Sequence, residues 1–169
     1  MAVLIDRMLG AARLDAATYE EVEQDRTATG QALGVVVLSS VATGLGLGAG
    51  VRGLLINTAA SIVLWAIWTA LVYWIGTRLL AEPDTRADWG ELARTIGFAQ
   101  APGVLRVLAI IPILGDFIRA GVDVWVLIAT VVAVRQALDY RSLPRAVGVC
   151  VIGWALQIVV FAVLRRALV

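Results

Sequence analysis

Long stretches without a charged residue constrain this chain more than any other feature of its sequence. Residues 27–51 and 53–77 each run for 25 positions without Asp, Glu, Lys or Arg, and residues 146–164 do so for 19. Because an α-helix rises about 1.5 Å per residue, about 20 apolar residues cross the hydrocarbon core of a bilayer. The composition agrees, with 60% of the 169 residues hydrophobic, 16% charged and a mean hydropathy of +0.88. The sequence therefore predicts an integral membrane protein.

Two further apolar segments contain charges, prolines and glycines. Asp88 followed by Glu91 is the pattern of a capping box, and Pro102 predicts a kink or break because it lacks a backbone N–H. The fold class that follows is all-α, an integral membrane bundle of five transmembrane helices behind an N-terminal amphipathic segment. The membrane domain is residues 27–169, with approximate spans at 30–50, 54–78, 91–114, 117–138 and 146–165.

Residues 1–26 form the sizeable polar segment of the chain. Asp6, Arg7 and Arg13 lie off an apolar stripe whose residues recur at helical spacing. The stripe consists of Leu4, Ile5, Met8, Leu9 and Ala12. Two interpretations stay open, a helix lying at the bilayer surface and a helix packed on the cytoplasmic end of the bundle. Asp15 is expected to cap a second short helix. Its acidic residues are expected to form an exposed face, for solvation or for docking a basic partner: Glu20, Glu21, Glu23 and Asp25.

The first span is rich in glycine. Three pairs lie four residues apart, a spacing that lets helices approach closely in lipid: Gly30/Gly34, Gly44/Gly48 and Gly46/Gly50. The end of this span, GLGLGAG, is expected to form a turn. It is not a nucleotide-binding loop, because no Lys-Ser or Lys-Thr follows it.

The distribution of arginines predicts the orientation. With the N-terminus in the cytoplasm the inner side holds nine: Arg7, Arg13, Arg26, Arg78, Arg86, Arg94, Arg135, Arg141 and Arg145. The outer side then holds four: Arg52, Arg119, Arg165 and Arg166. The positive-inside rule therefore favours a cytoplasmic N-terminus and an outer C-terminus.

Charges near the third and fourth spans are the candidate functional residues: Arg106, Asp116, Arg119 and Asp123. The last three share one helix face, and Arg119 and Asp123 are an i,i+4 pair. A hairpin near Pro112 would bring Arg106 opposite the fourth span, so we expect Arg106 to pair with a carboxylate there. Ionisable residues at membrane depth are costly and often functional. The cluster is either an ion-paired structural staple or a gated polar path or lipid-headgroup site.

Several chemistries are not expected. The chain has no His, which removes Ser-His and Cys-His catalysis and the common zinc helices. The single Cys150 lies in an apolar run and is interpreted as a small hydrophobe. A formal net charge of +1 offers no basic surface for nucleic acid. We expect no catalytic residues, no metal and no cofactor, and hence no enzyme.

The segment GFAQAP resembles a family motif. Gly97, Phe98 and Pro102 match the Gly-aromatic-x-x-x-Pro pattern in the third span of the Yip family, the Ypt/Rab GTPase-interacting membrane proteins. The stretches LDAATYEEVEQDRTATGQA, IGTRLL, RTIGFAQAPG and VAVRQALDY are similar to ones in short bacterial members. The resemblance implies a bacterial plasma membrane protein without a settled activity. It does not favour a Rab GTPase as partner, because the long N-terminal region of the eukaryotic members is missing.

The leading interpretation is a non-enzymatic multi-pass membrane protein that organises membrane or partner proteins. Its expected partners are membrane lipids, with other membrane proteins or self-association as further alternatives, and no nucleic acid. One alternative is a small transporter, channel or lipid-headgroup binder that uses the Arg/Asp cluster. Another is a subunit of a larger membrane complex, with the glycine-rich first span as its interface. A water-accessible cavity at Arg106 and Asp123 would favour the first alternative, and a dry, fully paired cluster would favour scaffolding.

Overall fold

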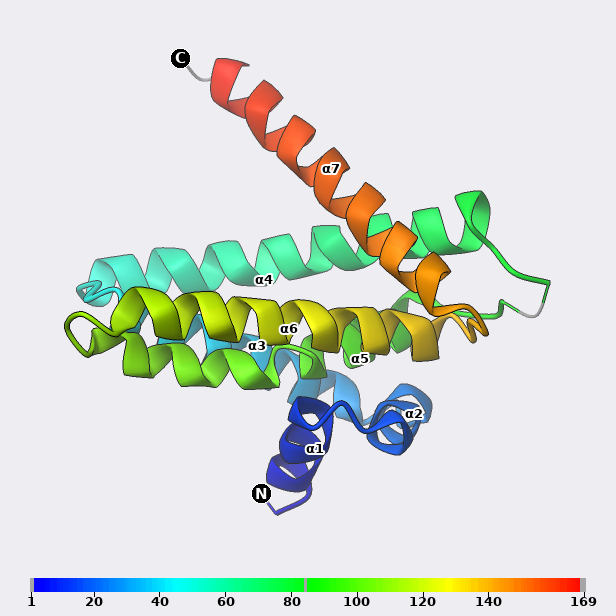
Figure 1. Cartoon of the computed structure of the whole chain (residues 1–169), viewed down its shortest axis with the longest axis horizontal. Coiled ribbons are helices and arrows are strands. Elements are labelled where there is room, and N and C mark those ends of the chain that lie inside the picture. Colours follow the sequence, from blue (N-terminus) through cyan, green and yellow to red (C-terminus); the bar gives the residue numbers. More distant parts are fainter. Residues whose placement is uncertain (1, 84, 168–169) are drawn as a thin grey trace.

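The computed structural model describes residues 2–83 and 85–167, with side chains as far as Val159 (Figure 1), and all its regular elements are helical. The N-terminal pair is α1 (Ala2–Ala12) and α2 (Ala16–Gln24). The long helices are α3 (Ala28–Gly46), α4 (Val51–Trp74), α6 (Gly115–Ala137) and α7 (Leu143–Ala167). The remaining elements are a π-helical extension of α4, η1 (Ile75–Leu79), a short α5 (Trp89–Phe98) and a 3-10 helix, η2 (Ala101–Ile110).

Three helical segments are long and apolar enough to cross a membrane: 28–46, 51–79 and 115–137. α7 adds a shorter apolar stretch, Leu143–Val159, in the part searched. These segments support an all-helical membrane protein. The count of five spans stays a prediction, because α5 and η2 are each too short to qualify alone.

Local signals in the sequence set several helix ends. Asp15 caps α2, and Asp88 and Glu91 form the expected capping box at the start of α5. The GLGLGAG segment ends α3 in a turn, where Gly48 has a φ of +68° that a side chain would strain. α5 ends at Phe98 and η2 begins at Ala101, with Pro102 in its first turn. The break expected around Pro102 is therefore confirmed.

The α5–η2 segment is the centre of the bundle. α5 contacts α3, α4 and α6, while η2 contacts α3 and α6. α7 packs on α4, η1 and α6 near its start and then leans away from them (Figure 1). Glycine allows close approaches here: a Cβ on Gly97 of α5 would lie 2.8 Å from the Ala32 Cβ of α3, and one on Gly46 of α3 would lie closer still to the Arg106 carbonyl oxygen of η2.

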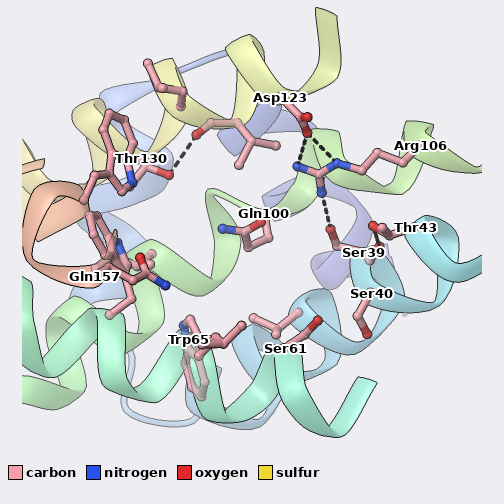
Figure 2. Close-up of a pocket in the computed structure, with 17 residues that line it drawn as sticks. Ser39, Ser40, Thr43, Ser61, Trp65, Gln100, Arg106, Asp123, Thr130 and Gln157 are labelled. Atoms are coloured by element: carbon pink, nitrogen blue, oxygen red, sulfur yellow. Dashed lines mark hydrogen bonds and ion pairs between the residues drawn. The ribbon is translucent and has the colours of Figure 1, made fainter. Parts of the chain in front are cut away.

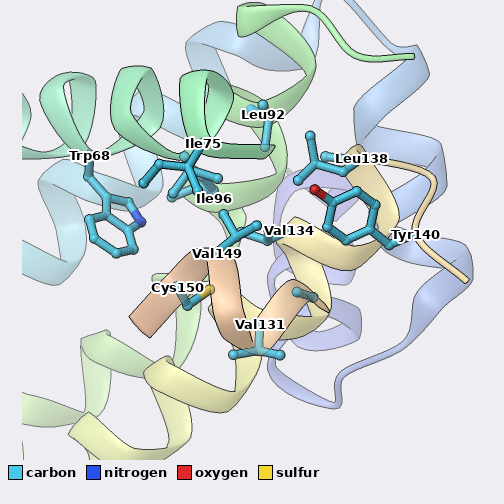
Figure 3. Close-up of a cluster of buried hydrophobic side chains, with 13 residues drawn as sticks. Trp68, Ile75, Leu92, Ile96, Val131, Val134, Leu138, Tyr140, Val149 and Cys150 are labelled. Atoms are coloured by element: carbon cyan, nitrogen blue, oxygen red, sulfur yellow. The ribbon is translucent and has the colours of Figure 1, made fainter. Parts of the chain in front are cut away.

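Two hydrophobic clusters fill the interior. The first joins α4, η1, α5, α6 and α7 and includes Trp68, Ile75, Leu92, Leu138 and Val149 (Figure 3). Cys150 is buried in it, as expected of a small apolar residue. The Tyr140 hydroxyl closes this cluster, lying 2.8 Å from the Gly76 carbonyl oxygen and 2.9 Å from that of Leu80. These carbonyls belong to the end of the π-helical turn, which would otherwise leave them without partners.

The second cluster holds α1 and α2 against the side of the bundle. Tyr19, Val22 and Phe98 are fully buried in it together with alanines of α3 and α6. The Trp125 indole, near the middle of α6, donates to the Ala12 carbonyl oxygen at 2.8 Å. The helix pair therefore packs along the bundle and not only over its end. Part of the apolar stripe of α1 remains exposed, including Ile5 (55%) and Leu9 (49%).

Candidate functional site

Arg106 and Asp123 form an ion pair between η2 and α6. The guanidinium Nε and Nη2 atoms both lie 2.8 Å from Oδ1 of Asp123, and Nη1 donates to Oγ of Ser39 on α3 at 3.2 Å. The predicted pairing of Arg106 with a carboxylate of the fourth span is confirmed, because the hairpin between η2 and α6 brings the two elements together. The Arg106 side chain is 15% exposed and that of Asp123 is 60% exposed.

The other two predicted residues do not join this pair. Arg119 lies within an i,i+4 step of Asp123, but its guanidinium binds Asp116, one turn earlier in α6. Asp116 is 86% exposed and Arg119 is 37% exposed. The four residues therefore form two pairs, Arg106 with Asp123 and Arg119 with Asp116, and Arg119 does not bind Asp123 as the i,i+4 spacing suggested.

A cavity of about 420 Å³ opens beside the Arg106–Asp123 pair (Figure 2). Side chains from α3, α4, α5, η2, α6 and α7 and the α5–η2 junction line it. Its polar lining residues are Ser39, Ser40, Thr43, Ser61, Gln100, Arg106, Asp123, Thr130 and Gln157. Its remaining lining residues are Val36, Leu64, Trp65, Trp68, Ile96, Val126, Leu127 and Trp154. The cavity thus has an apolar frame and a distributed set of polar groups.

Some of the polar lining is already satisfied by the protein. The hydroxyls of Thr43 and Thr130 each donate to a carbonyl one turn earlier in their own helix, at 2.8 Å. Ser40 does the same to Val37 at 2.8 Å. Such bonds are the usual way for a hydroxyl to be tolerated in an apolar helix. These three groups therefore contribute little to recognition.

Other polar groups at the cavity lack a partner in the described part of the chain. The Trp65 Nε1–H is buried and makes no hydrogen bond. The side chains of Ser61 and Gln100 have no hydrogen bond among the described residues, although both line the cavity. The Trp65 Nε1 atom is itself buried and is not reached from the cavity, whereas the partly exposed side chains of Ser61 and Gln100 can bond to a ligand.

The residues of the GFAQAP motif connect this cavity to the N-terminal helices. Phe98 is fully buried against α2 and α3 in the second cluster, and Pro102 is buried at the start of η2. Ile96 and Gln100, on either side of Phe98, line the cavity. The break in the third segment therefore has the N-terminal helices on one side and the cavity on the other.

A second charged cluster, which sequence reasoning missed, fastens α1 and α2; we call it the N-terminal clasp (Arg7, Glu21, Glu23, Asp25 and Arg94). Arg7 is 8% exposed and binds Glu21 Oε1 and Asp25 Oδ2 at 2.8 and 2.7 Å. Arg94 of α5 is 5% exposed and donates to the carbonyl oxygens of Val22 and Glu23. The sequence contained two signals for this cluster. Arg94 is a charged residue in an apolar helix, and residues 20–25 form a segment rich in acidic side chains.

The acidic residues of α2 do not all lie on the exposed face that the sequence predicted, because the clasp buries one of them. Glu23 is only 8% exposed, and its Oε2 is buried and has no hydrogen-bond partner among the described residues. Burial, with smaller contributions from Glu20, Asp139 and Glu91, raises the pKa of Glu23 to about 8. Hydrogen bonds from Thr27 and Arg7 lower the pKa of Asp25 to about 2. Glu20 and Glu21 remain exposed, so the face is acidic in part.

Among the described residues no group of three or more Cys, Asp or Glu side chains is placed to hold a metal ion. The polar groups of the cavity are hydroxyls, amides, an indole and one paired arginine, a set that suits binding of a polar head by hydrogen bonds.

The chain matches the model of a known family. The model of the Yip1 domain matches residues 5–164, which is nearly the whole chain. No curated protein and no solved structure matches the chain.

Proposed function

Because the chain belongs to the Yip1 domain family, we propose that it is a non-enzymatic multi-pass membrane protein that organises the membrane by binding a lipid in its cavity. The observation that carries this proposal is the cavity of about 420 Å³ beside Arg106 and Asp123. Cavities of this size are typical of ligand sites, and a membrane supplies amphiphilic ligands at high concentration. A lipid head would supply hydrogen-bond partners for the partly exposed side chains of Ser61 and Gln100.

The proposed topology keeps five crossings. α5 and η2 have 10 residues each. At about 1.5 Å per residue for an α-helix and about 2.0 Å for a 3-10 helix, the two end to end reach about 35 Å. That exceeds the hydrocarbon core of about 30 Å, so together they are long enough for one crossing. In this topology the N-terminus is cytoplasmic and the C-terminus lies outside, in a bacterial plasma membrane.

The same cavity favours a second candidate, a small transporter or channel. It differs from a lipid-binding protein in passing a solute from one side to the other. If the protein is a transporter or channel, sealed vesicles that contain it would release a trapped solute. If it only binds lipid, the vesicles would retain the solute.

Partner assembly through α3 is a weaker candidate. A Cβ on Gly44 would meet the Leu54 side chain, so Gly44 serves packing inside the chain, while Gly30 and Gly34 have nothing within 4 Å of such a Cβ. Small residues on an open helix face permit association, but they do not identify a partner.

The test fills the cavity. Ser61→Leu on α4 adds bulk at a lining position, and Ala60→Leu adds it at the neighbouring exposed position as a matched control. We expect the wild type and Ala60→Leu to retain lipid through detergent purification, measured by mass spectrometry of the extract, and Ser61→Leu to lose most of it. Equal retention by Ser61→Leu, with unchanged thermal unfolding, would overturn the proposal.

A further inference from the structure

The charges at the cavity specify the head of its ligand. Arg106 and Asp123 are both lining residues and together carry no net charge. A purely anionic head would approach the Asp123 carboxylate as well as the arginine, and a purely cationic head would approach the guanidinium. The pair therefore favours a head that carries both signs.

Asp123 has an unused acceptor. Both bonds from Arg106 end on the same carboxylate oxygen, Oδ1, and among the described residues Oδ2 has no partner. The side chain is 60% exposed, so Oδ2 is accessible without breaking the ion pair. This position suits a cation that can donate hydrogen bonds.

Donors for an anionic group lie deeper in the cavity. Ser39 accepts a bond from Arg106 through its oxygen, so its own hydroxyl hydrogen remains available. Figure 2 shows the ion pair at one end of the cavity, Gln100 beside its middle and Trp65 toward the other end. The Gln100 amide thus extends the row of donors from the pair along the cavity.

The aromatic lining does not form a box for a quaternary cation. Trp68 and Trp154 stack on each other, with centroids 5.8 Å apart and planes 18° from parallel. Their facing surfaces are therefore occupied, and cation–π recognition needs free aromatic faces around the cation. A head with N–H donors fits Asp123 better than a trimethylated head does.

We propose that the cavity selects a zwitterionic phospholipid with a primary ammonium group, the ammonium at Oδ2 of Asp123 and the phosphate at the donors of Arg106, Ser39 and Gln100. This selection rests on the proposed function and narrows it to one headgroup class. The phosphoethanolamine head is the simplest example, and the acyl chains would follow the apolar wall of Leu64, Trp65 and Leu127.

The test compares how well the wild-type protein retains lipids that differ only in their headgroup. Nanodiscs would contain equal amounts of phosphatidylethanolamine, its mono-, di- and trimethylated forms and phosphatidylglycerol, all with the same acyl chains. The lipid retained after transfer to detergent is then measured by mass spectrometry. We expect the primary amine to be enriched about tenfold over the trimethylated form, equivalent to about 1.4 kcal/mol, which is the scale of one hydrogen bond to a charged group. Retention should fall stepwise with each methyl group.

A variant separates the carboxylate from the rest of the cavity. Asp123→Asn should lose the preference for the primary amine, while Asp123→Glu should keep it. Equal retention of all heads, or preference for phosphatidylglycerol, by the wild type would overturn the headgroup assignment and leave lipid binding standing. Retention no higher than that of Ser61→Leu would instead overturn lipid binding itself.

Discussion

The N-terminal clasp and the cavity both contain arginine in largely buried positions, but they use it differently. In the clasp Arg94 donates into two carbonyl oxygens of α2 and Arg7 binds two carboxylates, so neither guanidinium faces an open space. At the cavity Arg106 binds only one carboxylate oxygen and one hydroxyl, beside about 420 Å³ of free volume. A buried guanidinium whose donors are all bonded within the protein holds one helix against another. A buried guanidinium beside a cavity can also bind a ligand.

The two regions are neighbours through α5 and η2. Arg94 and Phe98 of α5 hold the N-terminal helices, while Ile96 and Gln100 line the cavity. Side chains that alternate along this segment therefore point to opposite sides of it, toward the N-terminal helices and toward the cavity. Variants in this segment can therefore separate the structural role of the clasp from the binding role of the cavity.

Removing the Arg94 side chain is expected to have the largest effect. Arg94→Ala leaves the Val22 and Glu23 carbonyl oxygens without their donor, at about 1–3 kcal/mol for each buried acceptor. We predict a loss of about 3 kcal/mol of stability and faster proteolysis of residues 2–24, measured in detergent. Arg86→Ala, at an exposed position of the loop before α5, is the matched control and should unfold like the wild type.

Adding a side chain at Gly97 should have the next largest effect. A Cβ there would lie 2.8 Å from the Ala32 Cβ and 3.1 Å from its carbonyl oxygen, so α3 and α5 would have to separate. Gly97→Val should cost about 1–3 kcal/mol and weaken both the clasp and lipid retention. Gly34→Val, where nothing lies within 4 Å of an added Cβ, should do neither. A Gly97→Val protein with wild-type unfolding would disprove the close approach.

Because Glu23 is buried in the clasp, we predict that the docking of α1 and α2 depends on pH and that lipid binding in the cavity does not. The pKa of Glu23 is about 8 in the docked helix against an ordinary value of 4.5, so docking favours the neutral acid. The penalty for burying it is absent below the lower value, grows as the pH rises between the two values and is complete above the higher one. After correction for the intrinsic pH dependence of amide exchange, the protection of residues 2–24 should therefore fall between about pH 4.5 and about pH 8.

Glu23→Gln removes the titrating group while keeping its size. Exchange in this variant should be slower than in the wild type at neutral pH and should lose its dependence on this titration, whereas lipid retention should stay unchanged. Glu20→Gln, at an exposed neighbouring position, should leave most of the pH dependence in place. If Glu23→Gln leaves the exchange profile unaltered, Glu23 is not the group that titrates.

The exposed pair of Asp116 and Arg119 should matter least. Asp116 is 86% exposed, and pairs of this kind contribute about 0–1 kcal/mol. Arg119→Gln should shift thermal unfolding by less than about 1 kcal/mol and leave lipid retention at the wild-type level. A large loss of retained lipid would mean that the site extends to the start of α6.

Local chemistry made part of this structure predictable from the sequence. Uncharged runs, the Asp88 cap and Pro102 indicated the helices and the break, and the hairpin placed Arg106 opposite the fourth span without deciding between its carboxylates. The burial of Glu23 and Arg94 was not predictable, because it depends on how α2 meets α5 across about 70 residues of chain. The lining of the cavity was not predictable for the same reason, since its walls come from helices that are distant in sequence.

Lipid-dependent thermal unfolding of three proteins tests the separation of the two regions most directly. A ligand that binds the folded state raises its stability by an amount set by its concentration and affinity. Added phosphatidylethanolamine should raise the unfolding temperature of the wild type and of Arg94→Ala equally, although Arg94→Ala starts lower. Ser61→Leu should start near the wild type and show no rise. The reverse result, a lipid response lost in Arg94→Ala and kept in Ser61→Leu, would contradict the account.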